Sequence, residues 1–368
     1  MNREPDGAVV AAEKRVVVGM SGGVDSAVAA LRLIEAGYEV HGLYMSNWDD
    51  EDAYCSNAQD YQDARAAARE LGIVLHRVSF EPEYRARVFE EFLDEYRRGR
   101  TPNPDVLCNR EIKFGVCLHY AQRLGAQCFA TGHYARLAYD QDGPALLRGV
   151  DARKDQSYFL CGVERTRFAQ VLFPIGALSK TEVRAQAQRA GLPVFNKPDS
   201  TGICFIGERP FAQFLATYLP QNPGPIETAD GRRLGTHRGL HFYTLGQRGG
   251  LEIGGVRGAS GDPWYVAHKD PGRNALVVVA ARERDSVTTA ALHTGAVNWL
   301  IEPPAVPFMA GVKIRYRQPD QAARITPRAD GSVHIQFETP QWAATPGQIA
   351  ALYAGERCLG GGAIEETL

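Results

Sequence analysis

Short apolar runs alternate with amphipathic segments through the first half of the chain. The β-branched run at 15–20 predicts a buried strand, and the apolar stretch at 26–36 predicts a helix directly after it. Further strands are predicted at 38–45, 73–78 and 128–133, and further helices at 57–71 and 83–98. This order predicts an α/β fold with a doubly wound parallel sheet, which binds ligands at the carboxyl ends of its strands.

The pattern changes near residue 205, where short alternating segments and dense glycine begin. From about residue 286, polar and apolar residues alternate with period two, which is typical of half-buried strands. We therefore predict four parts: a disordered leader at 1–14, a catalytic domain at 15–206, a small mixed domain at 207–285 and a C-terminal β-barrel at 286–368.

Composition narrows the class of protein. No apolar run approaches the 18 residues that a transmembrane helix needs, and the polar start Met1–Gly7 lacks the apolar core of a signal peptide. The seven cysteines are odd in number and irregularly spaced, which argues against a secreted disulfide scaffold. We expect a cytoplasmic protein with no membrane association.

Charge is distributed unevenly along the chain. Residues 1–96 carry a net charge of -10, whereas residues 97–200 carry +7, although the whole chain is at only -2. A basic section beside an acidic one suggests that a polyanion docks on part of the surface. Chance clustering on a solvated face is the alternative, and charge alone does not establish nucleic-acid binding.

The segment Ser21–Ser26 has the sequence S-G-G-V-D-S and lies between the first predicted strand and its helix. Unpaired amides of such a turn and the positive end of the helix dipole both favour a bound phosphate. The loop of ordinary ATPases needs a Gly-Lys pair, and this chain has none. The S-G-G-x-D-S form resembles the pyrophosphate loop of enzymes that adenylate a substrate with ATP. A simple Gly-Ser turn is the alternative.

Two cysteines differ from the others in their surroundings. Cys108 follows two prolines, which predict a rigid extended or turning path, and Asp105 lies three residues before it. Cys204 lies between Gly202 and Gly207, on a segment where backbone can approach a ligand closely. The other five are assigned to buried positions: Cys55, Cys117, Cys128, Cys161 and Cys358.

With these motifs the chain resembles the bacterial tRNA-uridine 2-sulfurtransferases, or 2-thiouridylases, over nearly its whole length. The matching motifs are Gly19–Ser26, Asn103–Asp105 with Cys108, Thr131–Tyr134, Lys154–Tyr158, Gly202–Gly207 and Arg315–Tyr316. The resemblance implies a pyrophosphate-loop fold of the adenine nucleotide alpha hydrolase type.

The resemblance also implies the reaction. ATP, with Mg²⁺, would adenylate O2 of the wobble uridine (position 34) of tRNAs for Lys, Glu and Gln. Cys204 would carry a persulfide sulfur delivered by a sulfur-relay donor protein. Cys108 would attack this persulfide, which releases the sulfur to the base and leaves a transient Cys108–Cys204 disulfide. Direct attack by free sulfide is the second version. Asp105 would be the general acid or base.

The same resemblance assigns binding residues, with no protein-held metal among them. The expected ATP contacts are Gly19, Met20, Ser21, Gly22, Gly23, Val24, Asp25, Ser26, Met45 and Gly132. The expected tRNA contacts are Asn103, Pro104, Asp105, Lys154, Asp155, Gln156, Arg315 and Tyr316. We expect a monomer that binds one tRNA.

Several alternatives stay open at this point. Asp105 could instead cap the turn after Pro104, and Asp25 could hold Mg²⁺ or cap its helix. An iron–sulfur cluster held by Cys108, Cys204 and Asp105 has no support from spacing. Two other functions compete: adenylation of a small molecule, as in amidotransferases, and a nucleic-acid-binding module without chemistry. The first leaves the two cysteines without roles, and the intact loop weighs against the second.

Overall fold

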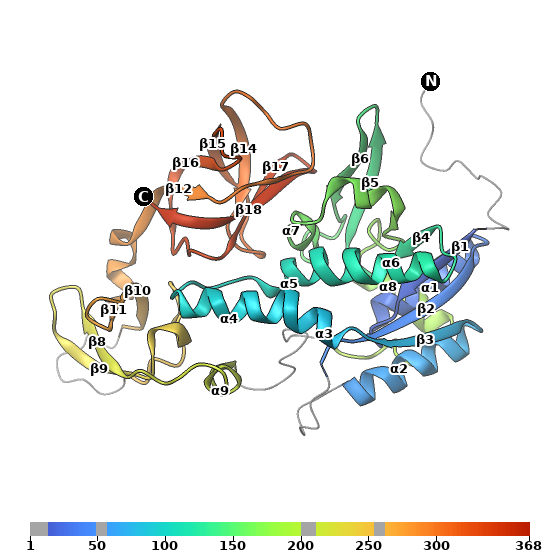
Figure 1. Ribbon diagram of the computed structural model, residues 1–368, viewed down its shortest axis with the longest axis horizontal. Coiled ribbons are helices and arrows are strands. Elements are labelled where there is room, and N and C mark those ends of the chain that lie inside the picture. The colour runs from blue at the N-terminus through green and yellow to red at the C-terminus, as the bar shows by residue number, and fades with distance from the viewer. Residues whose placement is uncertain (1–13, 49–56, 200–210, 254–261) are drawn as a thin grey trace.

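The computed structural model describes residues 14–48, 57–199, 211–253 and 262–368 (Figure 1). Its first part contains a parallel sheet with the strand order β3-β2-β1-β4-β7. The strands are β1 (Arg15–Gly19), β2 (Glu39–Ser46), β3 (Val74–Ser79), β4 (Cys128–Ala130) and β7 (Val171–Leu172). The order reverses between β1 and β4, so the loop after β1 lies at the switch point where such sheets bind ligands.

Both faces of this sheet are covered, which confirms the doubly wound prediction. In β1, Val16 and Val18 pack into one buried cluster with helix α1 (Val24–Glu35), whereas Val17 packs into a second cluster with Phe114. Strands buried on both faces read as continuous apolar runs rather than as alternating ones. This explains why residues 16–18 are all valine.

The helices largely match their predicted positions. Helix α2 spans Asn57–Glu70, and the predicted helix at 83–98 is a continuous run of α3 (Glu81–Tyr84), the π-helix η2 (Arg85–Phe89) and α4 (Glu90–Arg97). A further helical run was not predicted. It consists of α5 (Pro104–Leu107), the π-helix η3 (Cys108–Cys117) and α6 (Leu118–Arg123). The remaining helical elements are α7 (Ser157–Leu160), η4 (Arg165–Gln170), α8 (Lys180–Arg189), α9 (Phe211–Ala216), η5 (Leu240–Phe242) and η6 (Ala281–Ser286).

A small mixed sheet follows, with the order β10-β11-β8-β9. Its strands are β8 (Gly224–Thr228), β9 (Arg233–His237), β10 (Trp264–Asp270) and β11 (Ala275–Ala280). The predicted turn before β11 contains Asn274 at φ 50°, a left-handed conformation that asparagine tolerates better than most residues. In Figure 1 this sheet lies beside the C-terminal end of α4.

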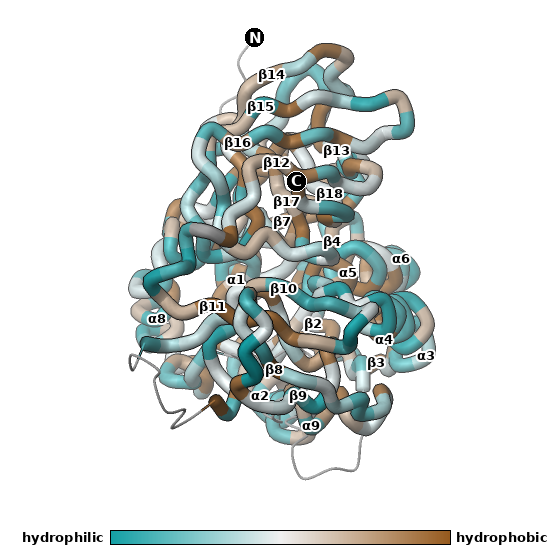
Figure 2. Tube along the Cα trace, turned by 90° about the vertical axis from the view of Figure 1, so that its left-hand side faces the viewer, coloured by the Kyte–Doolittle hydropathy of each residue, from teal (hydrophilic) through white to brown (hydrophobic). Residues whose placement is uncertain are grey.

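The last part of the chain is a closed β-barrel. Its strands are β12 (Thr288–Thr294), β14 (Phe308–Lys313), β15 (Gln321–Pro327), β16 (Val333–Trp342), β17 (Ile349–Ala354) and β18 (Arg357–Thr367), with β13 (Asn298–Trp299) paired to β18. The barrel closes because β18 pairs with both β17 and β12. Buried and less buried positions alternate along the first half of β16, and buried side chains from the barrel strands form the third buried cluster. Figure 2 shows apolar stretches along the barrel strands.

The hairpin of β5 (Ala135–Asp140) and β6 (Gly143–Arg148) connects the first part of the chain to the C-terminal barrel. It follows β4 in sequence, yet Leu147 pairs with Arg357 of β18. Sequence spacing gave no sign of this pairing, because it joins segments about 210 residues apart. Among the described residues, no helix combines the length and the apolar character needed to cross a membrane.

The extended or turning path predicted before Cys108 is a helical turn: Pro104 stands in the first turn of α5, where a missing N–H costs nothing, and Cys108 begins η3. Arg315 and Tyr316 do not lie in a strand, because β14 ends at Lys313 and the pair falls in the turn that follows.

Candidate functional site

The loop after β1 forms a compact turn at the N-terminus of α1. The Ser26 hydroxyl donates to the Gly23 carbonyl (3.0 Å) and accepts from the Ser21 amide (3.2 Å). Helix α1 begins two residues earlier than predicted, and its N-cap, Gly23, offers no side-chain cap. The first amides of the helix therefore have no intrahelical partners, an arrangement suited to an anion.

Two glycines allow the close packing of this turn. Gly22 has φ +75°, and a Cβ there would lie 2.3 Å from the Asp60 carbonyl oxygen. A Cβ on Gly132, just after β4, would lie 2.7 Å from the Ser26 nitrogen. Any side chain at either position would displace the loop. Two of the glycines expected at the nucleotide site, Gly22 and Gly132, are thus required by the backbone itself.

The carboxyl end of β2 lies at the same edge. Met45 accepts a weak hydrogen bond from the Cys117 thiol of η3 (3.4 Å), so this edge also contacts the helical run that carries Cys108. Burial raises the pKa of the Cys117 thiol to about 12, which keeps it protonated. Asn47, 8% exposed, has a side-chain oxygen without a hydrogen-bond partner among the described residues. Sequence reasoning did not single out Asn47.

Asp25 belongs to a network of charges. Both of its oxygens accept from Lys180 Nζ at 2.8 Å, and one accepts from the Tyr134 hydroxyl at 2.7 Å. Lys180 also contacts Asp199 (2.8 Å), and Lys154 and Arg184 bind the same carboxylate. Although burial opposes it, Lys154 and Lys180 lower the pKa of Asp199 to about 2. Lys180 connects this group of charges to the loop through Asp25.

Lys180 is a site residue that sequence reasoning missed. It stands at the first position of α8, after Ser179, whose side chain forms a capping box with Glu182. That S-x-x-E pattern marks a helix start, but nothing in the sequence says that α8 packs against α1. The contact with Asp25 spans 155 residues and arises only from tertiary structure.

Asp105 and Cys108 lie on consecutive turns of one helical run. Asn103 caps α5 by accepting from the Val106 amide (3.3 Å), so the cap of this turn is Asn103 and not Asp105. Cys108 is 1% exposed. The next residue, Asn109, donates to the Phe159 carbonyl (3.0 Å), which fixes the start of η3 against α7.

The surroundings of Asp105 favour its protonated form. Burial raises the pKa of the carboxyl group, and the positive charge of Lys113 opposes this effect only in part. Lys113 lies two turns further along the same helical run. Burial lowers the pKa of the His133 ring, and the positive charge of Lys113 lowers it further, so that this ring is kept neutral. A raised pKa favours the protonated carboxyl group, the form that can donate a proton.

The segment Lys154–Phe159 joins the two halves of the site. The Gln156 side chain accepts from the amide of Tyr134, the residue that contacts Asp25 (2.9 Å). Asp155 is 4% exposed and accepts from the amides of Gly149 and Ser157. The Asp155 carboxylate therefore holds this loop in shape and does not face solvent.

Arg315 and Tyr316 are placed differently from each other. The Arg315 guanidinium donates to the carbonyls of Leu245 (2.9 Å) and Ala343 (3.0 Å), which joins the barrel to the central sheet. Tyr316 packs against Phe159 with ring centroids 4.4 Å apart, and its hydroxyl lies 3.3 Å from the Lys154 carbonyl. Tyr316 thus extends the Lys154–Phe159 segment, whereas Arg315 is a link between domains.

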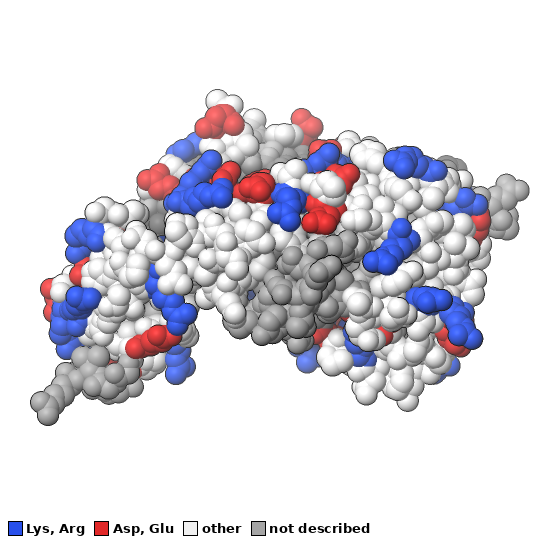
Figure 3. Space-filling model, turned by 60° about the horizontal axis from the view of Figure 1, so that its bottom comes forward, with Lys and Arg blue, Asp and Glu red and all other residues white. Residues whose placement is uncertain are grey.

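Cys204, the expected sulfur carrier, lies outside the described residues, as does the whole segment 200–210. The same holds for Cys55. On the face shown in Figure 3, basic side chains are spread over the surface with acidic ones among them. Lysine and arginine side chains therefore form no single uniform patch on this face.

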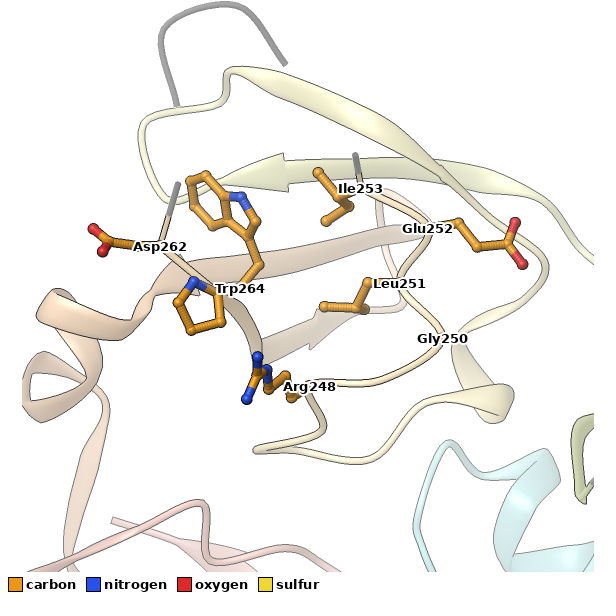
Figure 4. Close-up of a pocket in the computed structure, with 8 residues that line it drawn as sticks. Arg248, Gly250, Leu251, Glu252, Ile253, Asp262 and Trp264 are labelled. Carbon is orange, nitrogen blue, oxygen red and sulfur yellow. The ribbon is translucent and has the colours of Figure 1, made fainter. Parts of the chain in front are cut away.

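A cavity of about 520 Å³ lies beside the small mixed sheet, between 248–253 and 262–264 (Figure 4). Trp264 and Leu251 line the cavity, and Arg248 lies at its edge. None of the expected site residues lines it.

Comparison with known proteins identifies relatives along the whole chain. The tRNA methyl transferase HUP domain matches residues 14–208, the tRNA methyl transferase PRC-barrel domain 212–280, and the aminomethyltransferase beta-barrel domain 289–364. The tRNA-specific 2-thiouridylase MnmA of Halorhodospira halophila is 54% identical over 357 residues, covering 96% of this chain and 93% of the relative. That of Chromohalobacter salexigens is 52% identical over 356 residues, with the same coverage of both chains. That of Vibrio cholerae is 50% identical over 362 residues, 97% of each chain.

Proposed function

Because this chain belongs to the family of the tRNA-specific 2-thiouridylases, we propose that it is an ATP-dependent enzyme that converts the wobble uridine of tRNAs for Lys, Glu and Gln to 2-thiouridine. The observation that carries this proposal is the sequence identity of 52%, over 96% of this chain, to the tRNA-specific 2-thiouridylase MnmA of Chromohalobacter salexigens. The loop at the switch point of the sheet supports it, because it offers a phosphate cradle, and the helical run that carries Cys108 contacts the carboxyl end of β2 through Cys117 and Met45.

ATP would bind with its phosphates at the Ser21–Ser26 loop. The uncapped N-terminus of α1 supplies amides and a favourable dipole, and Lys180 supplies a charge beside them. The unpaired Asn47 oxygen at the end of β2 is an acceptor suited to an amino group of the base. Met45 would give the adenine an apolar contact.

Mg²⁺ fits the described residues poorly as a protein-held ion. Asp25, the expected ligand, accepts two hydrogen bonds from Lys180 and one from Tyr134. A carboxylate neutralised in this way is a weak ligand for a hard cation. We infer that Mg²⁺ enters on the phosphate oxygens of ATP, and we assign no step of the reaction to it.

In the proposed reaction, O2 of the uracil attacks the α-phosphorus of ATP and pyrophosphate leaves. The terminal sulfur of a Cys204 persulfide then attacks C2, and O2 departs with AMP. The Cys108 thiolate attacks the inner sulfur of Cys204, so that one sulfur stays on the base and a Cys108–Cys204 disulfide remains. An external thiol reductant must reduce this disulfide before the next turnover. The persulfide itself comes from a donor protein.

Asp105 would supply or accept the proton at the reacting base, which is consistent with the raised pKa of its carboxyl group. We assign Lys154, Gln156 and Tyr316 to tRNA binding, and Asn103 with Pro104 to the edge of the base pocket. Asp155 and Arg315 would contribute indirectly, by shaping the loop and by joining the domains.

The decisive experiment is nucleoside mass spectrometry on an unmodified tRNA-Glu transcript incubated with the protein, Mg-ATP and a persulfide donor. We expect one exchange of oxygen for sulfur at the wobble uridine, and none without ATP or with Cys204→Ser. Formation of AMP without any thiolated nucleoside would reject the proposal in favour of adenylation of a small molecule. Tight tRNA binding with neither product would indicate a binding module.

Replacing Lys180 by methionine should raise the KM for ATP about tenfold, the effect of losing roughly 1.4 kcal/mol of charge-assisted hydrogen bonding. The variant also leaves Asp25 beside the incoming phosphates without its counter-charge. Lys180→Arg keeps the charge and should recover most of the affinity. An unchanged KM for ATP in Lys180→Met, measured by initial rates of AMP formation, would contradict the role.

A further inference from the structure

The short segment 99–102 connects α4 to the helix that carries Asp105. After α4 the chain turns back beneath the barrel and reaches α5 at Pro104 (Figure 1). Thr101 is 8% exposed although it belongs to a connection between helices. Loops usually lie at the surface, so a buried one requires partners for its backbone groups.

Those partners come largely from the far end of the sequence. The Thr101 amide donates to the Pro346 carbonyl (2.9 Å), in the loop between β16 and β17 of the barrel. The side-chain amide of Gln348, from the same loop, donates to the carbonyls of Thr101 (2.8 Å) and Pro102 (3.2 Å). One side chain thus satisfies two consecutive carbonyls.

The backbones of the two loops are in close contact. Gly347 has φ +92°, and a Cβ there would lie 2.9 Å from the nitrogen, carbon and oxygen of Thr101. Both the backbone conformation and the missing side chain are therefore needed for the barrel loop to reach segment 99–102.

The central sheet holds the same segment from another direction. Lys269 of β10 donates to the Gly99 carbonyl (3.0 Å), and the hydroxyls of Thr101 and Thr244 are 3.3 Å apart. Burial lowers the pKa of Lys269 to about 8. Arg100 adds a link to the barrel through Glu365 and the Ile364 carbonyl.

This arrangement has a direct consequence for the candidate active site. Pro102 is one residue before the N-cap Asn103 and three residues before Asp105, so the path of segment 99–102 fixes where α5 begins. Proline at 102 and 104 makes this connection stiff, so a shift at Thr101 is passed on rather than absorbed.

We propose that Gln348 is a positioning residue: by holding the Thr101 and Pro102 carbonyls, it sets the place of Asp105 and Cys108, and the barrel thereby contributes to turnover. This inference rests on the proposed function for its catalytic consequence. Its structural consequence does not depend on that function. A displacement of about 1 Å in a reacting group can reduce a rate on the order of a hundredfold.

The test compares Gln348→Met with Gln336→Met in the full-length protein. Methionine has nearly the length of glutamine but no donor. Gln336 is an exposed barrel residue that donates to a single carbonyl, that of Ala290 (3.1 Å), away from segment 99–102. We expect Gln348→Met to lower the single-turnover thiolation rate at saturating tRNA about tenfold or more. The Kd for tRNA should stay within about twofold, and Gln336→Met should change neither quantity.

Amide hydrogen exchange gives a readout that needs no activity. Peptides covering 103–110 should exchange about tenfold faster in Gln348→Met than in the unsubstituted protein, while peptides of β1, α1 and the barrel strands keep their rates. Unchanged exchange in 103–110 would overturn the inference, whatever the catalytic result. Faster exchange throughout the barrel would also overturn it, because Gln348 would then serve only barrel stability. Failure of the unsubstituted protein to thiolate tRNA would reject the proposed function and leave the exchange experiment valid.

Discussion

Cys108→Ser should lower formation of 2-thiouridine by about a thousandfold or more, because removal of a reacting nucleophile typically costs this much. In the proposed route the Cys108 thiolate must attack the inner sulfur of the persulfide, and a serine hydroxyl is a far weaker nucleophile at neutral pH. The measurement is nucleoside mass spectrometry under single-turnover conditions.

The matched control is Cys128→Ser. Cys128 is a partly exposed residue of β4 outside the candidate site, and its substitution should leave the rate within about twofold, as surface substitutions usually do. Non-reducing peptide mapping after one turnover should find a Cys108–Cys204 disulfide in the unsubstituted protein. Full activity of Cys108→Ser would reject this route and favour attack by free sulfide.

Asp105→Asn should reduce thiolation about 10²- to 10⁴-fold, the usual contribution of a general acid or base. Asparagine has nearly the same shape and should preserve α5, whose cap is Asn103. The expected result is therefore a lower kcat with little change in the KM for ATP. An unchanged kcat would show that Asp105 is not the proton-transfer group.

The same substitution should increase stability at high pH. Burial raises the pKa of Asp105 in the folded state, so ionisation of this carboxyl disfavours folding. Its contribution to stability is fully present below the unfolded-state pKa and is lost as pH rises through the higher folded-state pKa. Asp105→Asn removes this loss. Its Tm relative to the unsubstituted protein should rise between pH 4 and pH 8.

That combination separates a catalytic role from a structural one. A residue that only holds the fold would lose activity and Tm together when it is replaced. For Asp105 we expect the two to move in opposite directions at pH 8, as happens where an active site is kept at a cost in stability. A lower Tm at pH 8 would contradict the electrostatic argument.

The sequence alone was informative wherever a feature is local. The apolar run of β1, the Gly-Ser turn and the helix after it were readable because a buried strand and a helix start have short-range signatures. The barrel could be predicted from period-two alternation for the same reason. Motif resemblance added Cys108, Cys204 and Asp105, whose roles stay predictions.

The helical run at 104–123 was not predicted from local sequence patterns. Two prolines and Asn103 read as an extended or turning path, yet Pro104 fits the first turn of a helix and Asn103 caps it. The π-helix η3 follows directly and has buried residues at Cys108, Ile112 and Gly115. Its side chains are fixed by packing against β1 through Val17 and Phe114.

The sequence by itself determined β1, the Gly-Ser turn and α1, and the early alternation of strands and helices, because each depends on neighbouring residues. Only the tertiary structure decided that Lys180 faces Asp25, that Tyr316 joins the Lys154–Phe159 segment, and that Gln348 holds Thr101. These contacts join residues 155, 162 and 247 positions apart. No short-range pattern encodes such pairs, since they form only when separately folded elements pack together.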